Sequence, residues 1–376
     1  MFPSHSADSP APNRQQQAPR QHGGPDALGV PRFDFSTNSN ACGPCPQALA
    51  AVQNTDATRY PDPNYTSLKR QLADFHGVDE ARVVLAGSAS EFIFRITAWV
   101  AQRLEGQGRV SLPPHSYGDY AQAAQAWGLG ATLNANAAQL VWACEPSSPL
   151  GQAHLTWPLW LMQAREVHRG GGDRDLALQA ETNRPKPPGA AQHPSSSTLV
   201  LDCAYAPLRL RGSPSLTAAQ SDHVWRLYSP NKSLGLTGVR AAYALAPLGS
   251  DVAVLELDRL CASWPVGAHG VAMLQAWVQS NVQDWLRQSL FTLTQWKERQ
   301  IDLLESRGWT LLPSDANFFC ARPPVDDLAA ELHRLRTHHG IKLRDAASFG
   351  LPGHVRLGVL PPEAQRALVT AICVSN

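Results

Sequence analysis

Short runs of almost wholly apolar residues alternate along the chain with longer segments in which apolar residues recur every three or four positions. The short runs include residues 82–86, 140–144 and 198–201, and they are typical of strands buried in a sheet. The longer segments are typical of helices that cover a sheet with one face. This alternation predicts an α/β architecture.

The longest helical pattern covers residues 271–306, where apolar residues such as Trp277, Val282 and Leu286 follow a mixed spacing of three and four. We predict one long helix here, which bridges two domains. A smaller α/β unit is predicted to follow it over residues 307–376.

The N-terminal end of the chain has a different composition. Residues 1–29 are rich in Pro, Gln, Ser, His and Gly and contain almost no aliphatic side chains, so burial cannot offset the entropy of ordering them. We predict a disordered tail there, then an arm over 30–58 and a large domain over 59–270. Within that domain, Gly, Pro, Ser and polar residues dominate 170–197, which is predicted to be a flexible insertion.

Composition and charge narrow the class of protein. The chain has 376 residues, of which 43% are hydrophobic and 17% charged, as in ordinary globular enzymes. A net charge of +1, with no concentrated basic patch, argues against binding to nucleic acid or to a membrane surface. No run of about 18 apolar residues occurs, and the start does not read as a signal peptide. We expect a cytoplasmic protein.

The seven cysteines are scattered and odd in number, which favours a reducing compartment. Cys42 and Cys45 form a Cys-x-x-Cys pair, but no second such pair and no pair of histidines at ligand spacing accompanies them. We interpret them as two loop thiols rather than as a metal or redox site, and no metal is predicted.

One lysine stands in a position suited to covalent chemistry. Residues 229–240 read Ser-Pro-Asn-Lys-Ser-Leu-Gly-Leu-Thr-Gly-Val-Arg and separate two predicted strands, so Lys232 lies on a tight, glycine-rich loop. Burial or the neighbouring cation Arg240 would favour the neutral amine, which can react with an aldehyde such as pyridoxal 5'-phosphate (PLP). The alternative is that Lys232 is a solvated surface lysine and that the glycines merely turn the chain.

The pattern Ser-x-x-Lys-x-x-Gly-Leu-x-Gly-x-Arg resembles the PLP-lysine segment of class I/II aminotransferases. The likeness is strongest to histidinol-phosphate aminotransferases and to the threonine-phosphate decarboxylases of cobalamin biosynthesis, and it spans roughly residues 32–375. It implies PLP-dependent fold type I, with a mostly parallel sheet, flanking helices and a smaller C-terminal α/β domain. It also implies a homodimer with shared active sites.

A turn of small residues is predicted to hold the cofactor phosphate. Ser88, Ala89 and Ser90 lie between an apolar strand and a helix, where backbone N–H groups, hydroxyls and the helix N-terminus attract an anion. The resemblance adds Ser229 and Arg240 to the cofactor site. It also implies that Tyr60, in a Tyr-Pro-x-Pro turn, reaches the phosphate bound by the partner subunit, unless it is simply a packed turn tyrosine.

The resemblance assigns further residues to the cofactor ring. Tyr117 would stack on its face, Asp202 would pair with the ring nitrogen, and Tyr205 would reach the phenolic oxygen. Ser148 stands where the family usually has an asparagine that donates to that oxygen, so the tuning of the ring differs. Tyr120, three residues after Tyr117, is predicted to be a packing residue.

Two arginines and one asparagine are predicted to bind the substrate. Arg356 lies in an apolar strand and, by the resemblance, would bind the α-carboxylate; the alternative is that it pairs with a protein carboxylate. Arg344 resembles a position that helps to hold a distal phosphate. Asn38 belongs to a segment resembling the arm that covers the substrate.

Three functions agree with these residues. The first is an aminotransferase like the histidinol-phosphate enzymes, acting on an amino acid or a phosphorylated amine, with Lys232, Asp202 and Tyr205 in the catalytic roles. The second is a threonine-phosphate decarboxylase, which the Asp-Phe-Ser-x-Asn arm favours. The third is a protein of the same fold that binds PLP without turnover, which the atypical Ser148 and Asn231 suggest.

Overall fold

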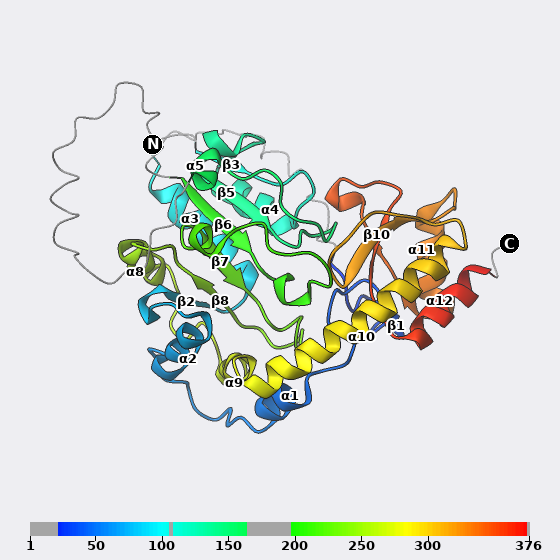
Figure 1. Ribbon diagram of the computed structural model, residues 1–376, viewed down its shortest axis with the longest axis horizontal. Coiled ribbons are helices and arrows are strands. Elements are labelled where there is room, and N and C mark those ends of the chain that lie inside the picture. The colour runs from blue at the N-terminus through cyan, green and yellow to red at the C-terminus, as the bar shows by residue number, and fades with distance from the viewer. Residues whose placement is uncertain (1–21, 105–107, 164–196, 374–376) are drawn as a thin grey trace, which may run out of the picture.

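The computed structural model describes residues 22–104, 108–163 and 197–373. Its larger part is organised around a seven-stranded sheet (Figure 1). All of its strands run parallel except β8, which is antiparallel to both of its neighbours. In spatial order the strands are β2 (Val83–Ala86), β8 (Ala242–Leu245), β7 (Trp225–Tyr228), β6 (Thr198–Asp202), β5 (Leu140–Cys144), β3 (Arg109–Ser111) and β4 (Gly130–Thr132).

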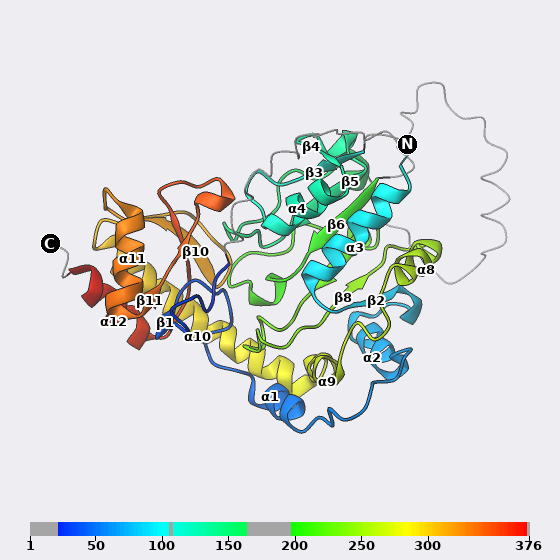
Figure 2. The same cartoon turned by 180° about the vertical axis from the view of Figure 1, so that it is seen from behind.

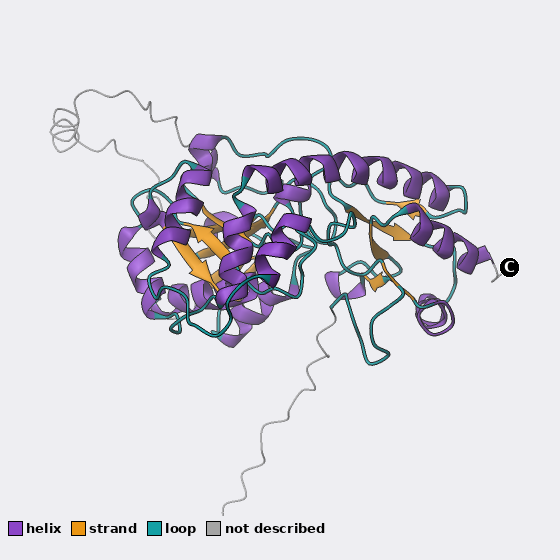
Figure 3. Ribbon diagram, turned by 90° about the horizontal axis from the view of Figure 1, so that it is seen from below, coloured by secondary structure: helices purple, strands orange, loops and turns teal. Residues whose placement is uncertain are grey.

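Helices cover both faces of this sheet (Figures 2 and 3). Side chains alternate along a strand, so Val84 of β2 packs with the core on one face and Leu85 with the core on the other. Burial on both faces explains why these strands read as continuous apolar runs. The first face is covered by α3 (Ala89–Gln102), α4 (Gly118–Ala126) and α8 (Asp251–Arg259); the second by α1 (Pro46–Gln53), α2 (Thr66–His76) and α9 (Ala268–Trp277).

Two short helices lie elsewhere in the larger part of the molecule. They are α5 (Leu159–Met162) and α7 (Ala218–Ser221). Leu161 of α5 packs with Leu199 of β6 in a small separate core.

The smaller part of the molecule is built on a four-stranded antiparallel sheet. Its order is β12 (Arg344–Asp345), β13 (Val355–Gly358), β10 (Phe318–Arg322) and β9 (Thr310–Leu311), with helices α11 (Leu328–His339) and α12 (Pro362–Cys373) beside it. The N-terminal arm joins this part, since β1 (Phe33–Asp34) pairs in parallel with β11 (Ile341–Lys342).

The predicted single helix over residues 271–306 is wrong, because two helices cover that stretch. Helix α9 ends at Trp277, and α10 (Ser280–Glu305) runs on from the larger part of the molecule to the smaller (Figure 1). Gln279 has an extended backbone, with φ −75° and ψ 140°, which ends the first helix. The apolar spacing continues across the break because Trp277 and Val282 pack into the same core.

The predicted disordered tail over residues 1–29 is corrected at its C-terminal end. Residues 1–21 lie outside the described part of the chain, but 22–29 are placed against the smaller part of the molecule. Asp26 forms ion pairs with Arg336 at 2.7 Å and with Lys342 at 3.1 Å. Ion pairs therefore hold this segment in place. The prediction of disorder considered only the lack of aliphatic residues, so it could not identify this segment as ordered.

The predicted insertion at 170–197 falls on residues that the structure does not describe, apart from Ser197. Within the described ranges, none of the helices combines the length and the apolar character needed to cross a membrane.

Candidate active site

A cavity of about 1000 Å³ lies between the two parts of the molecule, where strands β5, β6 and β7 end. Apart from Tyr60, every residue predicted for the site lines it: Asn38, Ser88, Ala89, Ser90, Tyr117, Ser148, Asp202, Tyr205, Ser229, Lys232, Arg240, Arg344 and Arg356. The carboxyl ends of parallel strands are where α/β folds usually bind ligands. The role of each residue stays a prediction.

Asp202 is the last residue of β6 and is buried at the wall of the cavity. Its Oδ2 accepts a hydrogen bond from the Tyr120 hydroxyl at 2.6 Å, and its Oδ1 accepts one from the backbone N–H of Ala204 at 2.9 Å. Burial raises the pKa of Asp202, and these two hydrogen bonds oppose that rise. The site therefore contains a desolvated carboxyl group whose charged form is supported by its neighbours.

Tyr120 has a contact that the sequence analysis missed. It is fully buried and stacks on Trp142 at 4.4 Å, as expected of a packing residue, but its hydroxyl also reaches Asp202. The signal available in the sequence was its three-residue spacing from Tyr117, which brings both rings to one side of a helix start.

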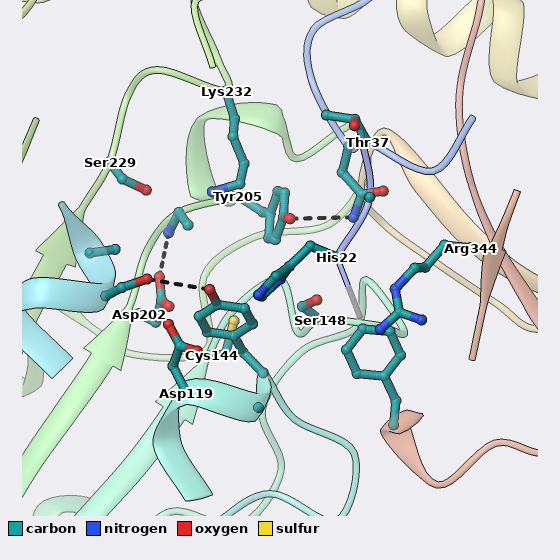
Figure 4. Close-up of a pocket in the computed structure, with 18 of the residues that line it drawn as sticks. His22, Thr37, Asp119, Cys144, Ser148, Asp202, Tyr205, Ser229, Lys232 and Arg344 are labelled. Atoms are coloured by element: carbon teal, nitrogen blue, oxygen red, sulfur yellow. Dashed lines mark hydrogen bonds between the residues drawn. The ribbon is translucent and has the colours of Figure 1, made fainter. Parts of the chain in front are cut away.

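Lys232 extends into the cavity from the loop between β7 and β8, toward the side where Ser229 and Asp202 lie (Figure 4). Its Nζ lies 5.4 Å from the centre of the Tyr205 ring. The N-terminal arm braces the loop, because the backbone N–H of Asn40 donates to the carbonyl of Lys232 at 2.9 Å. The amine is thus carried on a loop that the N-terminal arm holds in place.

The start of helix α3 forms one end of the cavity. Ser88 is its N-cap and accepts a hydrogen bond from the backbone N–H of Glu91 at 3.1 Å, while the Ser90 and Tyr117 hydroxyls are 3.3 Å apart. Nearby, the Ser229 hydroxyl is buried and has no hydrogen-bond partner among the described residues. A helix N-terminus and a hydroxyl without a partner suit an anionic ligand.

Tyr117 stands at the N-cap of α4 with its ring against the cavity. The ring meets that of Tyr120 edge to face, with centres 5.9 Å apart and planes at 87°. Burial raises the pKa of Tyr117, so its phenol stays neutral and its ring offers an apolar face to a flat ligand.

Two arginines approach from the smaller sheet, where Arg344 and Arg356 are directly opposite on β12 and β13. Arg356 donates to the Ser148 hydroxyl at 3.3 Å and to the carbonyl of Ser36 at 3.0 Å. Among the described residues it forms no ion pair with a carboxylate, so the alternative of a protein partner is not supported. Burial, and then the charge of Arg356, lowers the pKa of Arg344. An anion bound between them would relieve this repulsion.

Ser148 and Tyr205 are placed at the same side of the cavity as the arm. The Tyr205 hydroxyl accepts a hydrogen bond from Nδ2 of Asn38 at 3.3 Å, and the Asn38 Oδ1 is buried with no partner in the described part of the chain. Ser148 follows Glu145, whose ion pair with Arg209 at 2.7 Å anchors the loop. The Ser148 hydroxyl is thus engaged by Arg356 in this structure.

His22 also lines the cavity, and the sequence analysis did not consider it because it lies in the predicted tail. Its ring centre is 6.3 Å from that of Tyr117. Tyr60, by contrast, lies outside the cavity, is 78% exposed and stacks on Trp264 at 4.5 Å. The role predicted for it toward a partner subunit stays a prediction.

Residues 191–372 match the family model described as aminotransferase class I and II. Curated relatives include the histidinol-phosphate aminotransferase of Pseudomonas entomophila (strain L48), which is 25% identical over 349 residues and aligns with 90% of this chain and 92% of its own length. That of Ruegeria sp. (strain TM1040) is 26% identical, with coverages of 90% and 89%. Over residues 191–372 the chain is similar to the class I and II aminotransferases. The resemblance predicted from its motifs is confirmed.

Solved structures of this family share the fold. A histidinol-phosphate aminotransferase from Sinorhizobium meliloti in complex with pyridoxal-5'-phosphate has a TM-score of 0.70 at 22% identity, covering 90% of each chain. L-threonine-O-3-phosphate decarboxylase from Porphyromonas gingivalis has a TM-score of 0.67 at 18% identity, covering 91% of this chain and 98% of its own. The predicted α/β architecture of PLP-dependent fold type I is confirmed.

Proposed function

We propose that this aminotransferase relative is a PLP-dependent aminotransferase that acts on a phosphorylated amine or amino acid, as histidinol-phosphate aminotransferases do. The observation that carries the proposal is the position of Lys232 and Asp202 on the walls of one cavity, with the N-terminus of α3 at its end. A lysine amine, a carboxyl group and an anion site at a helix start are three groups that can together bind PLP.

The residues present fit the cofactor. Lys232 would hold it covalently, Asp202 would face its ring nitrogen, and Tyr117 would cover one ring face. The phosphate would be held by Ser88, Ala89, Ser90 and Arg240, and by the Ser229 hydroxyl that has no partner among the described residues. When bound, PLP supplies an electron-accepting ring.

The chain's own groups then do the remaining work. Once displaced by the substrate amine, the Lys232 amine can take a proton from the substrate Cα or return one. The Asp202 carboxylate would hold a proton at the ring nitrogen. The Tyr205 hydroxyl would donate toward the phenolic oxygen, while Asn38 orients it through the 3.3 Å hydrogen bond.

The arginine pair supports the substrate class that we propose. Arg356 would bind a carboxylate with its planar guanidinium group, and Arg344 would bind a distal phosphate. Both groups are buried, and both lie over the Phe349 ring, at 4.9 Å for Arg344 and 5.3 Å for Arg356. This arrangement supports a substrate that carries negative charge away from its amine.

A second candidate is decarboxylation of threonine phosphate, as in cobalamin biosynthesis. Two arginines in one cavity match its two anionic groups, a carboxylate and a phosphate, whereas histidinol phosphate carries the phosphate alone. A screen of phosphorylated amines and amino acids separates the candidates. Transamination requires a keto acid acceptor, and decarboxylation releases carbon dioxide without one. Failure of every substrate to react would favour a PLP-binding protein without turnover.

The proposal includes a cytoplasmic homodimer. Tyr60 is exposed beside the exposed Trp264, and in the dimer it would reach the phosphate site of the partner subunit. Sedimentation of the purified protein, with and without PLP, measures the oligomeric state.

Covalent labelling tests the cofactor. We expect borohydride reduction of the PLP-loaded protein, followed by peptide mass spectrometry, to find the pyridoxyl group on Lys232. Lys232→Ala should lose the label, and Lys69→Ala, a change on α2 outside the cavity, should keep it. A label found on another lysine in the wild-type protein would contradict the proposal.

A further inference from the structure

We propose that Tyr120 is a positioning residue that holds the Asp202 carboxylate in its charged form and aims it at the cofactor ring nitrogen. The inference rests on the proposed function, because it concerns the partner of that nitrogen. It assigns a role to a side chain whose sequence context indicated packing alone.

The geometry leaves the carboxylate little freedom. The Tyr120 hydroxyl donates to Oδ2 at 2.6 Å, a length typical of a hydroxyl that donates to a charged oxygen, and the Ala204 N–H donates to Oδ1 at 2.9 Å. Each oxygen thus has one protein donor and still has room for a second. Asp202 lines the cavity, so the remaining lone pairs can meet a ligand.

Tyr120 itself is held rigidly. Its ring is fully buried, lies parallel to Trp142 within 9° at 4.4 Å, and meets Tyr117 edge to face. It belongs to the first turn of α4, whose N-cap is Tyr117. One helix start therefore places both the ring expected to cover the cofactor and the hydroxyl that holds the partner of its nitrogen.

The charges around Asp202 support the same role. Burial raises the pKa of Asp202, and among the opposing influences the hydrogen bond from Tyr120 is the largest, followed by the Ala204 N–H and the charge of Lys232. The thiols of Cys144 and Cys203 also face Asp202, and burial raises their pKa values, so they stay neutral. Burial also raises the pKa of Tyr120, which therefore remains a proton donor.

The test measures the protonation of the ring nitrogen by nitrogen NMR of the protein loaded with isotope-labelled PLP. In Tyr120→Phe we expect the signal to move toward that of the unprotonated ring. Without the hydrogen bond from Tyr120, the charged form of Asp202, which keeps a proton on the ring nitrogen, is less stable. The proton equilibrium should change by roughly tenfold or more. Asp202→Ala removes the carboxylate altogether and provides the reference signal for a ring nitrogen without this partner.

Tyr243→Phe is the matched control. Tyr243 is also fully buried, and its hydroxyl contacts His76 at 2.8 Å and Trp277 at 3.1 Å, but it does not line the cavity. It should lose comparable stability and leave the nitrogen signal unchanged. A signal in Tyr120→Phe identical to that of the wild type and of this control would overturn the inference.

A second variant keeps the test decisive if Tyr120→Phe does not fold. A ring-fluorinated tyrosine at position 120 keeps the ring and hydroxyl but is a stronger donor, so the signal should move toward the protonated form. An unchanged signal would also overturn the inference. Borohydride labelling of Lys232 is run on the wild-type protein and on every variant. If the wild-type protein is not labelled at Lys232, the proposed function is refuted. If labelling is intact and the nitrogen signal is unchanged in the variants, only the role of Tyr120 is refuted.

Discussion

At the scale of single residues, the two glycines of the lysine loop, residues 229–240, differ in whether the backbone requires glycine there. Gly235 has φ +69°, and a Cβ there would lie 2.6 Å from the carbonyl oxygen of Gly43 in the N-terminal arm. Gly238 has neither a positive φ nor any atom within 4 Å of the Cβ position. The motif contains both, so the sequence alone could not tell which one the fold requires.

We expect Gly235→Ala to lower the free energy of unfolding by about 2 kcal/mol or more, because it adds backbone strain and a clash with the arm. Gly238→Ala should change it by less than about 1 kcal/mol in either direction. Denaturant unfolding of both variants checks this. Equal losses in the two would show that the loop does not pack against the arm as described.

At the scale of elements, the segment 22–29 connects the smaller part of the molecule to the cavity. Asp26 is held by Arg336 and Lys342, and the carbonyl of Gly24 accepts a hydrogen bond from Lys342 at 2.6 Å. These contacts place His22 and Gly23 at the cavity wall. Arg336 and Lys342 hold the pKa of Asp26 well below its usual range, so the tether is charged at neutral pH.

Asp26→Ala should therefore release this segment. We expect proteolysis within 22–29 to become faster and KM for the substrate to rise severalfold, since the contacts of His22 and Gly23 with the cavity are loosened. Asp56→Ala is the control, because Asp56 is exposed and pairs with the exposed Arg59. If cleavage and KM in Asp26→Ala match those of the control, the segment is held by other contacts.

At the scale of the whole molecule, His76 joins several elements on one face of the large sheet. It ends α2, contacts the Tyr243 hydroxyl of β8 at 2.8 Å, and packs its ring 4.7 Å from that of Tyr228 on β7. Burial, and then the charge of Arg226, lowers the pKa of His76 to about 4. Charging this ring in the folded protein is therefore unfavourable.

The consequence is a loss of stability in mild acid. The unfolded chain binds a proton at His76 near pH 6.5, whereas the folded protein does so only near pH 4. Stability should fall as the pH is lowered across this window, by about 3 kcal/mol in total from this group. His76→Gln cannot titrate and should flatten the pH dependence of unfolding, while His269→Gln, at an exposed position, should not. If the free energy of unfolding of His76→Gln depends on pH as steeply as that of the wild-type protein, this account is wrong.

The sequence by itself determined the features that depend on local pattern. Continuous apolar runs predicted buried strands, and the glycines around Lys232 predicted a loop between two strands, where the structure places it at the cavity. The resemblance pointed to Asp202 too, and a residue that ends a buried parallel strand lies at the edge of the sheet where ligands bind. The buried strands and the position of the lysine loop agree with the structure because a few neighbouring residues decide them, while the roles of Lys232 and Asp202 stay predictions.

The tertiary structure decided what depends on residues far apart in the chain. The hydrogen bond between Tyr120 and Asp202 spans 82 positions and that between Asn38 and Tyr205 spans 167. The ion pair that places residues 22–29 joins Asp26 to Arg336. The apolar spacing did not reveal the break between α9 and α10, because both helices bury their apolar residues in one core. Local sequence contains no record of which distant group satisfies a buried polar atom, and only packing brings the two together.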